Sequence, residues 1–499
     1  MKEAEIETPI ELQCEGHDAE LAKEWQSIDW QYVEKQVGRL QAKISKATSD
    51  GRMNDAMRFS HLLTKSFTAR ALAVKKVCSN DGSMTPGVDG VLWLTDAQKM
   101  RAVKELDSKS YKSKPLRRVE IPKKNGKTRP LGIPTMYDRA MQTLHWLALD
   151  PICEATSDPF SYGFRKGRSC QDACERLFKA FTNANRADWA LEGDIRGCFD
   201  HISHEWLMTN IPMDKKVLNQ FLKAGFVFDR KLFPTEEGTP QGGAISPTLA
   251  NMTLNGMDAL LKEHFGAGAG VTLVRYADDF VVTARTREDA EKAKEILVPF
   301  LAKRGLELSP EKTVITHIED GFDFLGFNFR RYDNDKLIIK PSAKAFDSIK
   351  TKVREVILGF GKAESQATII MRLNPIIRGW CNYHSHNCSK NTFKALHDYI
   401  YHLLERWAQR RHSRKTRIWW LRRYWHRKGG RGWAFSCMVQ GRDGPVELEL
   451  FSPKMTAIRR HVLVRHGANP YLDTEYFEER SKPGGKLRCR RLPSASPPS

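Results

Sequence analysis

The sequence predicts a mixed α+β fold class, in which helical segments flank a central region of strands and helices. Between residues 135 and 330, helical patterns alternate with short apolar strands, such as the one that begins at Trp189. The apolar residues before this region recur at helical spacing, and beyond Lys340 the pattern becomes helical again. With 499 residues, of which 40% are hydrophobic, the chain is long enough for about three domains with buried cores.

The first expected element is an N-terminal helical segment, from Trp25 to about Ala73. Helical spacing predicts one helix that carries Trp30, Val33, Val37 and Leu40 and a second that carries Leu62, Leu63 and Phe67. The first residues lack the basic-then-apolar order of a signal peptide, and no run of about 18 apolar residues could span a bilayer. We therefore expect a cytoplasmic protein with no membrane partner.

The charge balance predicts a polyanionic partner. The chain has 81 Lys and Arg against 60 Asp and Glu, a net charge of +21, which favours nucleic acid over an acidic membrane surface. Its ten cysteines include no C-x-x-C pair, which fits reduced thiols better than a disulfide framework or a zinc ribbon.

A basic hairpin is expected next, at residues 119–134. The sequence VEIPKKNGKTRPLGIP predicts two short strands joined by Asn125-Gly126, a dipeptide typical of tight hairpin turns. The residues alone indicate no more than a solvated basic face there.

Acidic residues mark the centre of the chain. Asp278 and Asp279 lie side by side in VRYADDFVV, between two apolar runs, which predicts the tip of a β-hairpin. Two charges ~4 Å apart repel by about 4 kcal/mol in a partly buried site, so a positive group is expected nearby. Asp194 ends another predicted strand, and three carboxylates suffice for a pair of Mg²⁺ ions. The alternative, solvated turn residues, is the more common reading of an isolated Asp-Asp pair.

The C-terminal third predicts a helical bundle with a basic surface. One apolar stripe consists of Phe393, Leu396, Ile400, Leu403, Leu404 and Trp407. Residues 401–435 contain eleven Lys or Arg and one acid, interspersed with aromatic residues. This segment is either a phosphate-binding face, which the charge favours, or a packed helix whose buried stripe is Ile418, Leu421 and Trp425. Cys381, His384 and Cys388 share one helical face, which favours core packing over zinc binding.

The order of motifs along the chain resembles one family. The motifs are TPGVDG, IPKKNGKTRPLGIPTMYDRAMQ, PFSYGFRKGRSCQDA, GDIRGCFDHISH, TPQGGAISP, YADD, LSPEKT, FDFLGF and NPIIRGWCNYHSHN. Together they resemble the group II intron-encoded reverse transcriptases and maturases, over roughly residues 25–480. Many members continue into a zinc-stabilised HNH endonuclease, which we do not expect in this chain.

The resemblance implies a right-hand polymerase followed by an α-helical thumb and a basic C-terminal region. The expected divisions are an N-terminal helical segment at 1–75, reverse transcriptase fingers and palm at 76–335, a thumb or maturase domain X at 336–412, a basic DNA-binding region at 413–482 and a disordered tail at 483–499.

The same resemblance implies the site residues. Catalytic and metal-binding roles, with two Mg²⁺ ions, fall to Asp194, Asp278 and Asp279. The expected nucleotide-binding residues are Lys123, Arg129, Phe199 and Gln241, with Phe199 as a wall against the sugar 2′-position. The expected RNA-binding residues are Arg378, Trp380, Arg406, Arg410 and Arg414.

The implied function is an RNA-directed DNA polymerase, encoded by a group II intron, that is also a maturase and supports intron mobility. Its partners would be intron RNA, target DNA and primer, and deoxynucleoside triphosphates, with association at the nucleoid when it acts on DNA; a homodimer stays open. Two alternatives remain: the reverse transcriptase of a retron or CRISPR-linked system, and a non-catalytic RNA-binding splicing factor.

Overall fold

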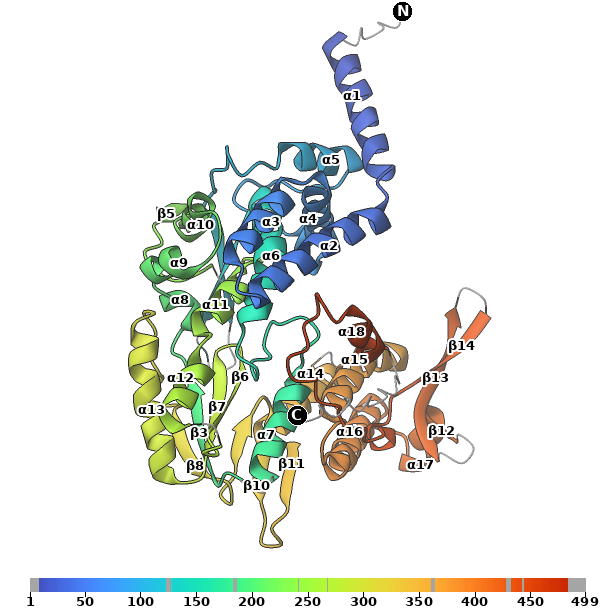
Figure 1. Ribbon diagram of the computed structural model, residues 1–499. Coiled ribbons are helices and arrows are strands. Elements are labelled where there is room, and N and C mark those ends of the chain that lie inside the picture. The colour runs from blue at the N-terminus through green and yellow to red at the C-terminus, as the bar shows by residue number, and fades with distance from the viewer. Residues whose placement is uncertain are drawn as a thin grey trace, which may run out of the picture.

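A computed structural model describes residues 9–122, 126, 128–182, 186–240, 242–266, 268–359, 364–427, 432–441 and 444–482. It is a mixed α+β structure, as expected, with an N-terminal helical layer, a central sheet and a C-terminal helical group arranged in chain order (Figure 1). Lys123, Gln241 and the tail at 483–499 lie outside the described residues.

The N-terminal layer consists of helices that pack on a long buried helix, α6. The helices are α1 (Pro9–Gln26), α2 (Trp30–Ser49), α3 (Met53–Lys65), α4 (Phe67–Ser79), α5 (Asp96–Glu105) and α6 (Met136–Thr156). Val33 and Val37 are buried, as their spacing predicts. The second predicted helix is wrong in detail: α3 ends at Lys65 and α4 begins at Phe67, and Leu62 is exposed.

The predicted basic hairpin is confirmed. Strand β1 (Leu116–Pro122) pairs antiparallel with β2 (Thr128–Ile133) and extends into a four-stranded sheet with β4 (Phe226–Phe228) and β5 (Lys231–Phe233). The helices that follow in this part of the chain are α8 (Cys198–His201), α9 (His204–Asn210), α10 (Lys215–Leu222) and α11 (Ser246–Leu254), of which α9 and α10 lie near β5 in Figure 1.

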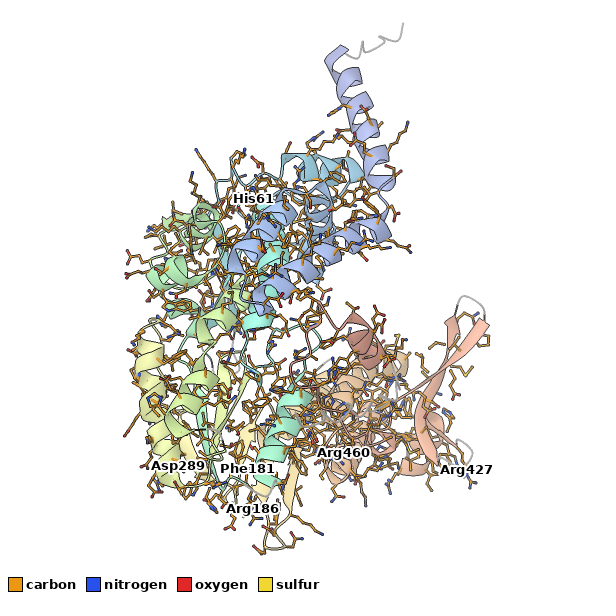
Figure 2. All side chains as sticks on the ribbon, in the orientation of Figure 1. His61, Phe181, Arg186, Asp289, Arg427 and Arg460 are labelled. Atoms are coloured by element: carbon orange, nitrogen blue, oxygen red, sulfur yellow. The ribbon has the colours of Figure 1, made fainter. Side chains whose placement is uncertain are left out.

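The central sheet has the strand order β6-β7-β3-β8. Its strands are β6 (Thr272–Tyr276), β7 (Asp279–Ala284), β3 (Trp189–Asp194) and β8 (Val314–His317). Helices α12 (Met257–Phe265) and α13 (Arg287–Ala302) lie on one side of it, and α7 (Cys170–Thr182) lies on the other, as Asp289 of α13 and Phe181 of α7 indicate in Figure 2.

Both faces of the central sheet are covered, because successive residues of a strand point to opposite faces. Leu191 belongs to the core that includes Ala293 of α13, whereas its neighbour Ala190 belongs to the core that includes Leu177 of α7. The same holds in β7, whose apolar run Phe280-Val281-Val282 places Phe280 and Val282 in the first core and Val281 in the second.

The helical group follows a small sheet of β9 (Phe322–Phe324), β10 (Phe327–Arg331) and β11 (Leu337–Pro341). It consists of α14 (Ala343–Leu358), α15 (Gln366–His384) and α16 (Lys390–Arg411). All six residues of the predicted stripe on α16 are buried. Helix α15 ends at His384, so Cys388 is not on its face as predicted; Cys388 is exposed, whereas Cys381 and His384 are buried.

The segment after α16 differs from the predicted helix. Helix α17 (Arg417–Tyr424) is short, and it is followed by a three-stranded antiparallel sheet of β12 (Trp425–Arg427), β13 (Trp433–Gly441) and β14 (Gly444–Glu449). Ile418, assigned to a buried stripe, is exposed. A final segment returns to the main body and ends in α18 (Thr474–Ser481) (Figure 1).

Candidate active site

The two adjacent aspartates lie at the tip of a hairpin, as predicted. Strands β6 and β7 pair so that Tyr276 faces Asp279, which leaves Ala277 and Asp278 as a two-residue turn. Ala277 has a φ of 61°, in the left-handed region that two-residue hairpin turns use. The turn therefore carries Asp278 on the tip itself and Asp279 on the first strand position after it.

Asp194 is brought to the same tip by the register of the sheet. Strand β3 pairs antiparallel with β7, and Asp194 lies directly opposite Asp279. Directly opposed residues have Cβ atoms about 4.5–5.5 Å apart. The approach depends on Gly193, because a Cβ there would lie 2.1 Å from the ring of Phe280. Residues more than 80 positions apart thus bring their carboxyl groups to one edge of the sheet.

Asp278 and Asp279 at this tip are harder to ionise than free carboxylic acids. Burial, with the neighbouring Asp278 and Asp194 carboxylates, raises the pKa of Asp279 to about 6. The pKa of Asp278 is raised mainly by burial and also by Asp194. Both shifts show that a nearby cation would be stabilising.

Lys312 supplies part of the expected positive charge. Its Nζ donates to Oδ2 of Asp194 at 2.9 Å. The segment that carries Lys312 is fixed to the end of β3, because the Ser309 amide donates to the Asp194 carbonyl at 2.8 Å. The hydrogen bond to Asp194 raises the pKa of Lys312, and Lys312 in turn lowers the pKa values of Asp278 and Asp279.

A second cation, Arg275, lies fully buried beneath the hairpin. Its guanidinium donates to the Ala277 carbonyl at 3.1 Å, to Asn251 Oδ1 at 3.0 Å and to Asn255 Oδ1 at 3.1 Å. Asn251 also donates to the carbonyl of Gly163 at 2.8 Å, and a Cβ at Gly163 would lie 2.2 Å from the Ala277 nitrogen. The turn thus rests on a fixed support that sequence reasoning did not identify.

The donor set fits divalent metal ions. Three carboxylates offer the hard oxygen ligands that Mg²⁺ prefers. Among the residues that the structure describes, no three His, Cys, Asp or Glu side chains are already arranged as a metal cage.

Two of the predicted nucleotide-binding residues are described, and both lie at this site. Arg129, exposed on β2, is close enough to Asp278 to lower the pKa of that carboxyl group. Phe199 is half-buried in α8, with its ring edge-on to Phe164 at 6.2 Å between centroids, and its carbonyl accepts from the Thr239 amide at 2.7 Å. Phe164, with a φ of 60°, was not predicted.

The predicted RNA-binding residues divide into two groups. Arg406 and Arg410 are exposed one turn apart on α16, and Arg414 is exposed just after that helix. Arg378 is exposed on α15, with its guanidinium over the ring of Phe451. Trp380 is half-buried and contacts the rings of His384 and Phe393, which indicates a packing role.

Three family descriptions match consecutive parts of the chain. "N-terminal domain of reverse transcriptase" matches residues 25–106, and "Reverse transcriptase (RNA-dependent DNA polymerase)" matches residues 121–329. "Group II intron, maturase-specific domain" matches residues 346–425. No helix in the described ranges is long and apolar enough to cross a membrane.

The chain is also similar to several named proteins. Protein YkfC of Escherichia coli is 35% identical over 305 residues, which cover 52% of this chain and 80% of that protein. The group II intron-encoded protein LtrA of Lactococcus lactis is 29% identical over 409 residues, covering 63% of this chain and 68% of LtrA. Among solved structures, telomerase from Candida albicans matches with a TM-score of 0.38 and 12% identity, covering 62% of this chain and 64% of that one.

Proposed function

Because the chain belongs to the group II intron-encoded reverse transcriptases, we propose that the acidic tip formed by β3, β6 and β7 is its polymerase centre. The observation that supports this assignment is the register that sets Asp194 opposite Asp279 and next to Asp278. The protein is an RNA-directed DNA polymerase with a maturase domain, and it acts on RNA and other nucleic acid.

In this proposal the three aspartates hold two Mg²⁺ ions, the divalent metal suited to their oxygen donors. Such ions activate a primer 3′-hydroxyl and stabilise the leaving pyrophosphate. The chain's own task is to hold the carboxylates together, and Arg275 and Asn251 do so by fixing the turn. Lys312 donates to Oδ2 of Asp194 and so also helps to orient that carboxylate at the tip.

The proposed substrate site lies between the acidic tip and the basic hairpin. Arg129 of β2 faces the triphosphate, since a planar guanidinium matches phosphate oxygens. Lys123 and Gln241 are assigned the neighbouring phosphate and nucleotide contacts by resemblance alone. Phe199 stands against the sugar, where its ring excludes a 2′-hydroxyl and so selects deoxynucleotides.

The proposed maturase role uses the group of helices α14–α16. Arg406, Arg410 and Arg414 present a row of exposed guanidinium groups to phosphates of the intron RNA. By holding its own intron RNA, the protein would support both splicing and the copying of the intron into target DNA from a DNA primer. The splicing chemistry belongs to the RNA.

The decisive test separates the two activities with Asp278→Asn. We expect primer extension on an RNA template with deoxynucleotides to fall by about 10²-fold or more, because metal affinity and charge stabilisation are lost. Intron RNA binding should not change, and the melting temperature should not fall, because one of three mutually repelling charges is gone. Asp333→Asn, an exposed acid far along the chain, is the matched control.

Equal loss of extension and RNA binding in Asp278→Asn would show that this acid is structural. A wild-type protein that binds intron RNA but extends no primer would support the alternative, a non-catalytic splicing factor.

A further inference from the structure

A pocket of about 460 Å³ opens between the helical group and the C-terminal sheet. Its helical wall is formed by α15 and α16, with Arg378, His397 and Tyr401, and its other wall by β12–β14 and the segment that follows them. Such volumes fall within the range of small-ligand sites, about 300–1,000 Å³. The pocket is separate from the acidic tip.

The lining is unusually aromatic. Trp425 contacts the ring of Tyr401 at 5.7 Å and that of Phe435 at 5.0 Å, in edge-on arrangements. Phe451 lies under the guanidinium of Arg378 at 5.1 Å. Rings of this kind offer flat surfaces to planar ligands.

One aromatic residue of this wall is largely exposed. In β13, Trp433 and Phe435 point to the same face, because they are two positions apart. Phe435 is 3% exposed against the helices, whereas Trp433 is 64% exposed, although both line the pocket. Trp433 therefore presents an open ring on the side of the sheet that forms the pocket wall.

The charged groups of the pocket fit a nucleotide. Arg378 and Lys454 line it, and Arg427 lies directly across from Trp433 in the neighbouring strand β12, at the end of the sheet seen in Figure 2. These cationic side chains are suited to bind the phosphate oxygens of a nucleotide. Glu449 is an acceptor in the lining, suited to the amino group of a base.

The two walls are locked together before any ligand arrives. Asn374 of α15 donates to the Glu449 carbonyl at 2.9 Å and accepts from the Phe451 amide at 2.7 Å. His397 of α16 hydrogen-bonds to Ser452 at 3.3 Å. A rigid pocket loses little entropy when it binds.

We propose that this pocket binds one unpaired nucleobase of the intron RNA, which stacks on Trp433 while its phosphate meets Arg378 or Arg427. The proposal rests on the maturase function proposed above, and RNA is the chosen partner because the maturase-specific match spans both helices of the pocket wall. Paired RNA would not fit, since its bases are stacked within the duplex.

The test compares Trp433→Ala with Met438→Ala in the full-length protein. Met438 is a matched control, because it is 62% exposed on the same strand but points to the other face. The probe is a labelled eight-nucleotide single-stranded RNA, alongside the same RNA as a duplex and the same sequence as single-stranded DNA, with binding followed by fluorescence anisotropy. We expect Trp433→Ala to weaken single-stranded RNA binding by about 5- to 150-fold, the effect of losing one stacked base.

Met438→Ala and Trp433→Phe should bind as the wild type does, and duplex RNA should show no dependence on Trp433. Ultraviolet crosslinking of the RNA probe should label a peptide from residues 432–441. Primer extension by Trp433→Ala on an RNA template should be unchanged, so that failure of the pocket and failure of the polymerase assignment can be told apart.

The proposal is overturned if Trp433→Ala and Met438→Ala bind the RNA equally, or if only the DNA probe depends on Trp433. It is also overturned if Trp433→Ala changes self-association but not RNA binding, because the open ring would then serve a second copy of the chain. Loss of RNA binding by the wild-type protein itself would refute the maturase proposal instead.

Discussion

At the scale of single residues, Ala277 has a strained backbone conformation in the turn that carries Asp278. Its φ of 61° costs an L-residue about 1–2 kcal/mol, and glycine adopts it freely. We therefore expect Ala277→Gly to raise the free energy of unfolding by up to about 1 kcal/mol, after the entropy that glycine gains in the unfolded chain is subtracted. Chemical denaturation measures this.

The control for that substitution is Ala284→Gly, at the end of the same strand β7. Ala284 is fully buried and is not among the positive-φ residues, so the same change should lower the free energy of unfolding there. A loss of stability in both variants would show that the turn is not strained.

Phe199 gives a second residue-scale prediction, on substrate choice. Removing its ring in Phe199→Ala should open space beside the sugar and relax the preference for deoxynucleotides over ribonucleotides by about 10- to 200-fold. Primer extension with each nucleotide separately measures the ratio. The control is Phe233→Ala, which removes a ring from the outer strand β5 and should leave the ratio unchanged. A similar change in both variants would mean that Phe199 has a packing role and does not select the sugar.

The sequence predicted the hairpin, its two aspartates and the position of Asp194, because turn residues and apolar runs are local signals. The sequence also predicted a positively charged group near the two aspartates, but it did not identify the residue. Lys312 and Arg275 could not be chosen from the pattern, since their partners depend on how distant segments meet. In the sequence, Lys312 is marked only by its place in the LSPEKT motif.

At the scale of elements, α16 combines a buried stripe with an exposed basic one. If Arg406 and Arg410 contact RNA phosphates, replacing both with glutamine should make binding less dependent on salt. The slope of log affinity against log salt should fall in magnitude by about 1.4–1.8, or 0.7–0.9 for each lost contact. Binding measured between 50 and 200 mM salt gives the slope.

The matched control for α16 is the double variant Lys292→Gln and Lys303→Gln. Both lysines are exposed, in α13 and just beyond its end, on the back of the central sheet. This double variant removes two positive charges, as the α16 variant does. An equal change in slope would therefore mean that Arg406 and Arg410 act only through the net charge of the protein.

The helices of this region were predictable, whereas the sheet β12–β14 was not. Trp425 fits a helical stripe with Leu421, but it pairs instead with Phe435 across two strands. The aromatic residues of 419–435 suit either structure, and the choice is made by the core on α15 and α16 that Trp425 and Phe435 join. Ile418, which the helical reading buried, is left exposed.

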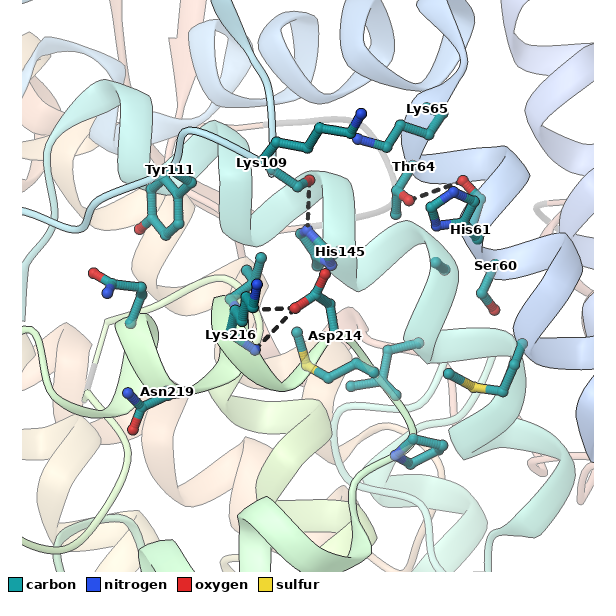
Figure 3. Close-up of a pocket in the computed structure, with 18 of the residues that line it drawn as sticks. Ser60, His61, Thr64, Lys65, Lys109, Tyr111, His145, Asp214, Lys216 and Asn219 are labelled. Carbon is teal, nitrogen blue, oxygen red and sulfur yellow. Dashed lines mark hydrogen bonds between the residues drawn. The ribbon is translucent and has the colours of Figure 1, made fainter.

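At the scale of the whole molecule, buried histidines make stability depend on pH. His145 of α6 borders a pocket of about 700 Å³ between the N-terminal layer and α10, where Ser108 lies 3.2 Å from its Nε2 (Figure 3). Burial lowers the pKa of His145 to about 4. Burial likewise lowers the pKa of His384 to about 4, in α15.

Because the folded pKa lies below the unfolded value of about 6.5, the unfolded chain binds more protons between pH 4 and 6.5. Stability should therefore rise with pH across this window and be complete above it, with a loss of about 3 kcal/mol for His145 below pH 4. His145→Gln should flatten the dependence of the melting temperature on pH in this window. An unchanged slope would show that His145 titrates normally.

The C-terminal segment returns from the sheet β12–β14 to α7. Asp172 of α7 is fully buried and accepts from the Arg480 guanidinium at 2.6 Å and the Val464 amide at 2.9 Å; His461 Nε2 lies 2.9 Å from the same carboxylate. Burial would raise the pKa of Asp172, but the bond to His461 and the charge of Arg480 outweigh it and lower the pKa. Part of the predicted DNA-binding region is thus engaged within the chain.

A second contact reaches the N-terminal layer, where Asn469 donates to Ser45 at 2.8 Å. The segment therefore links the first and last parts of the chain across the central sheet. Removing Asp172, its main anchor, should destabilise the N-terminal part, the central sheet and the C-terminal part. In Asp172→Ala the guanidinium of Arg480, whose side chain is 11% exposed, loses its carboxylate partner, so the free energy of unfolding should fall by up to about 3–5 kcal/mol. Glu175→Ala is the control, one turn along α7, because its partner Arg460 is 81% exposed and 3.7 Å away. Such an exposed pair contributes about 1 kcal/mol or less.

Limited proteolysis should cut residues 456–482 faster in Asp172→Ala alone, and equal cleavage in the two variants would show that the segment is held by its other contacts.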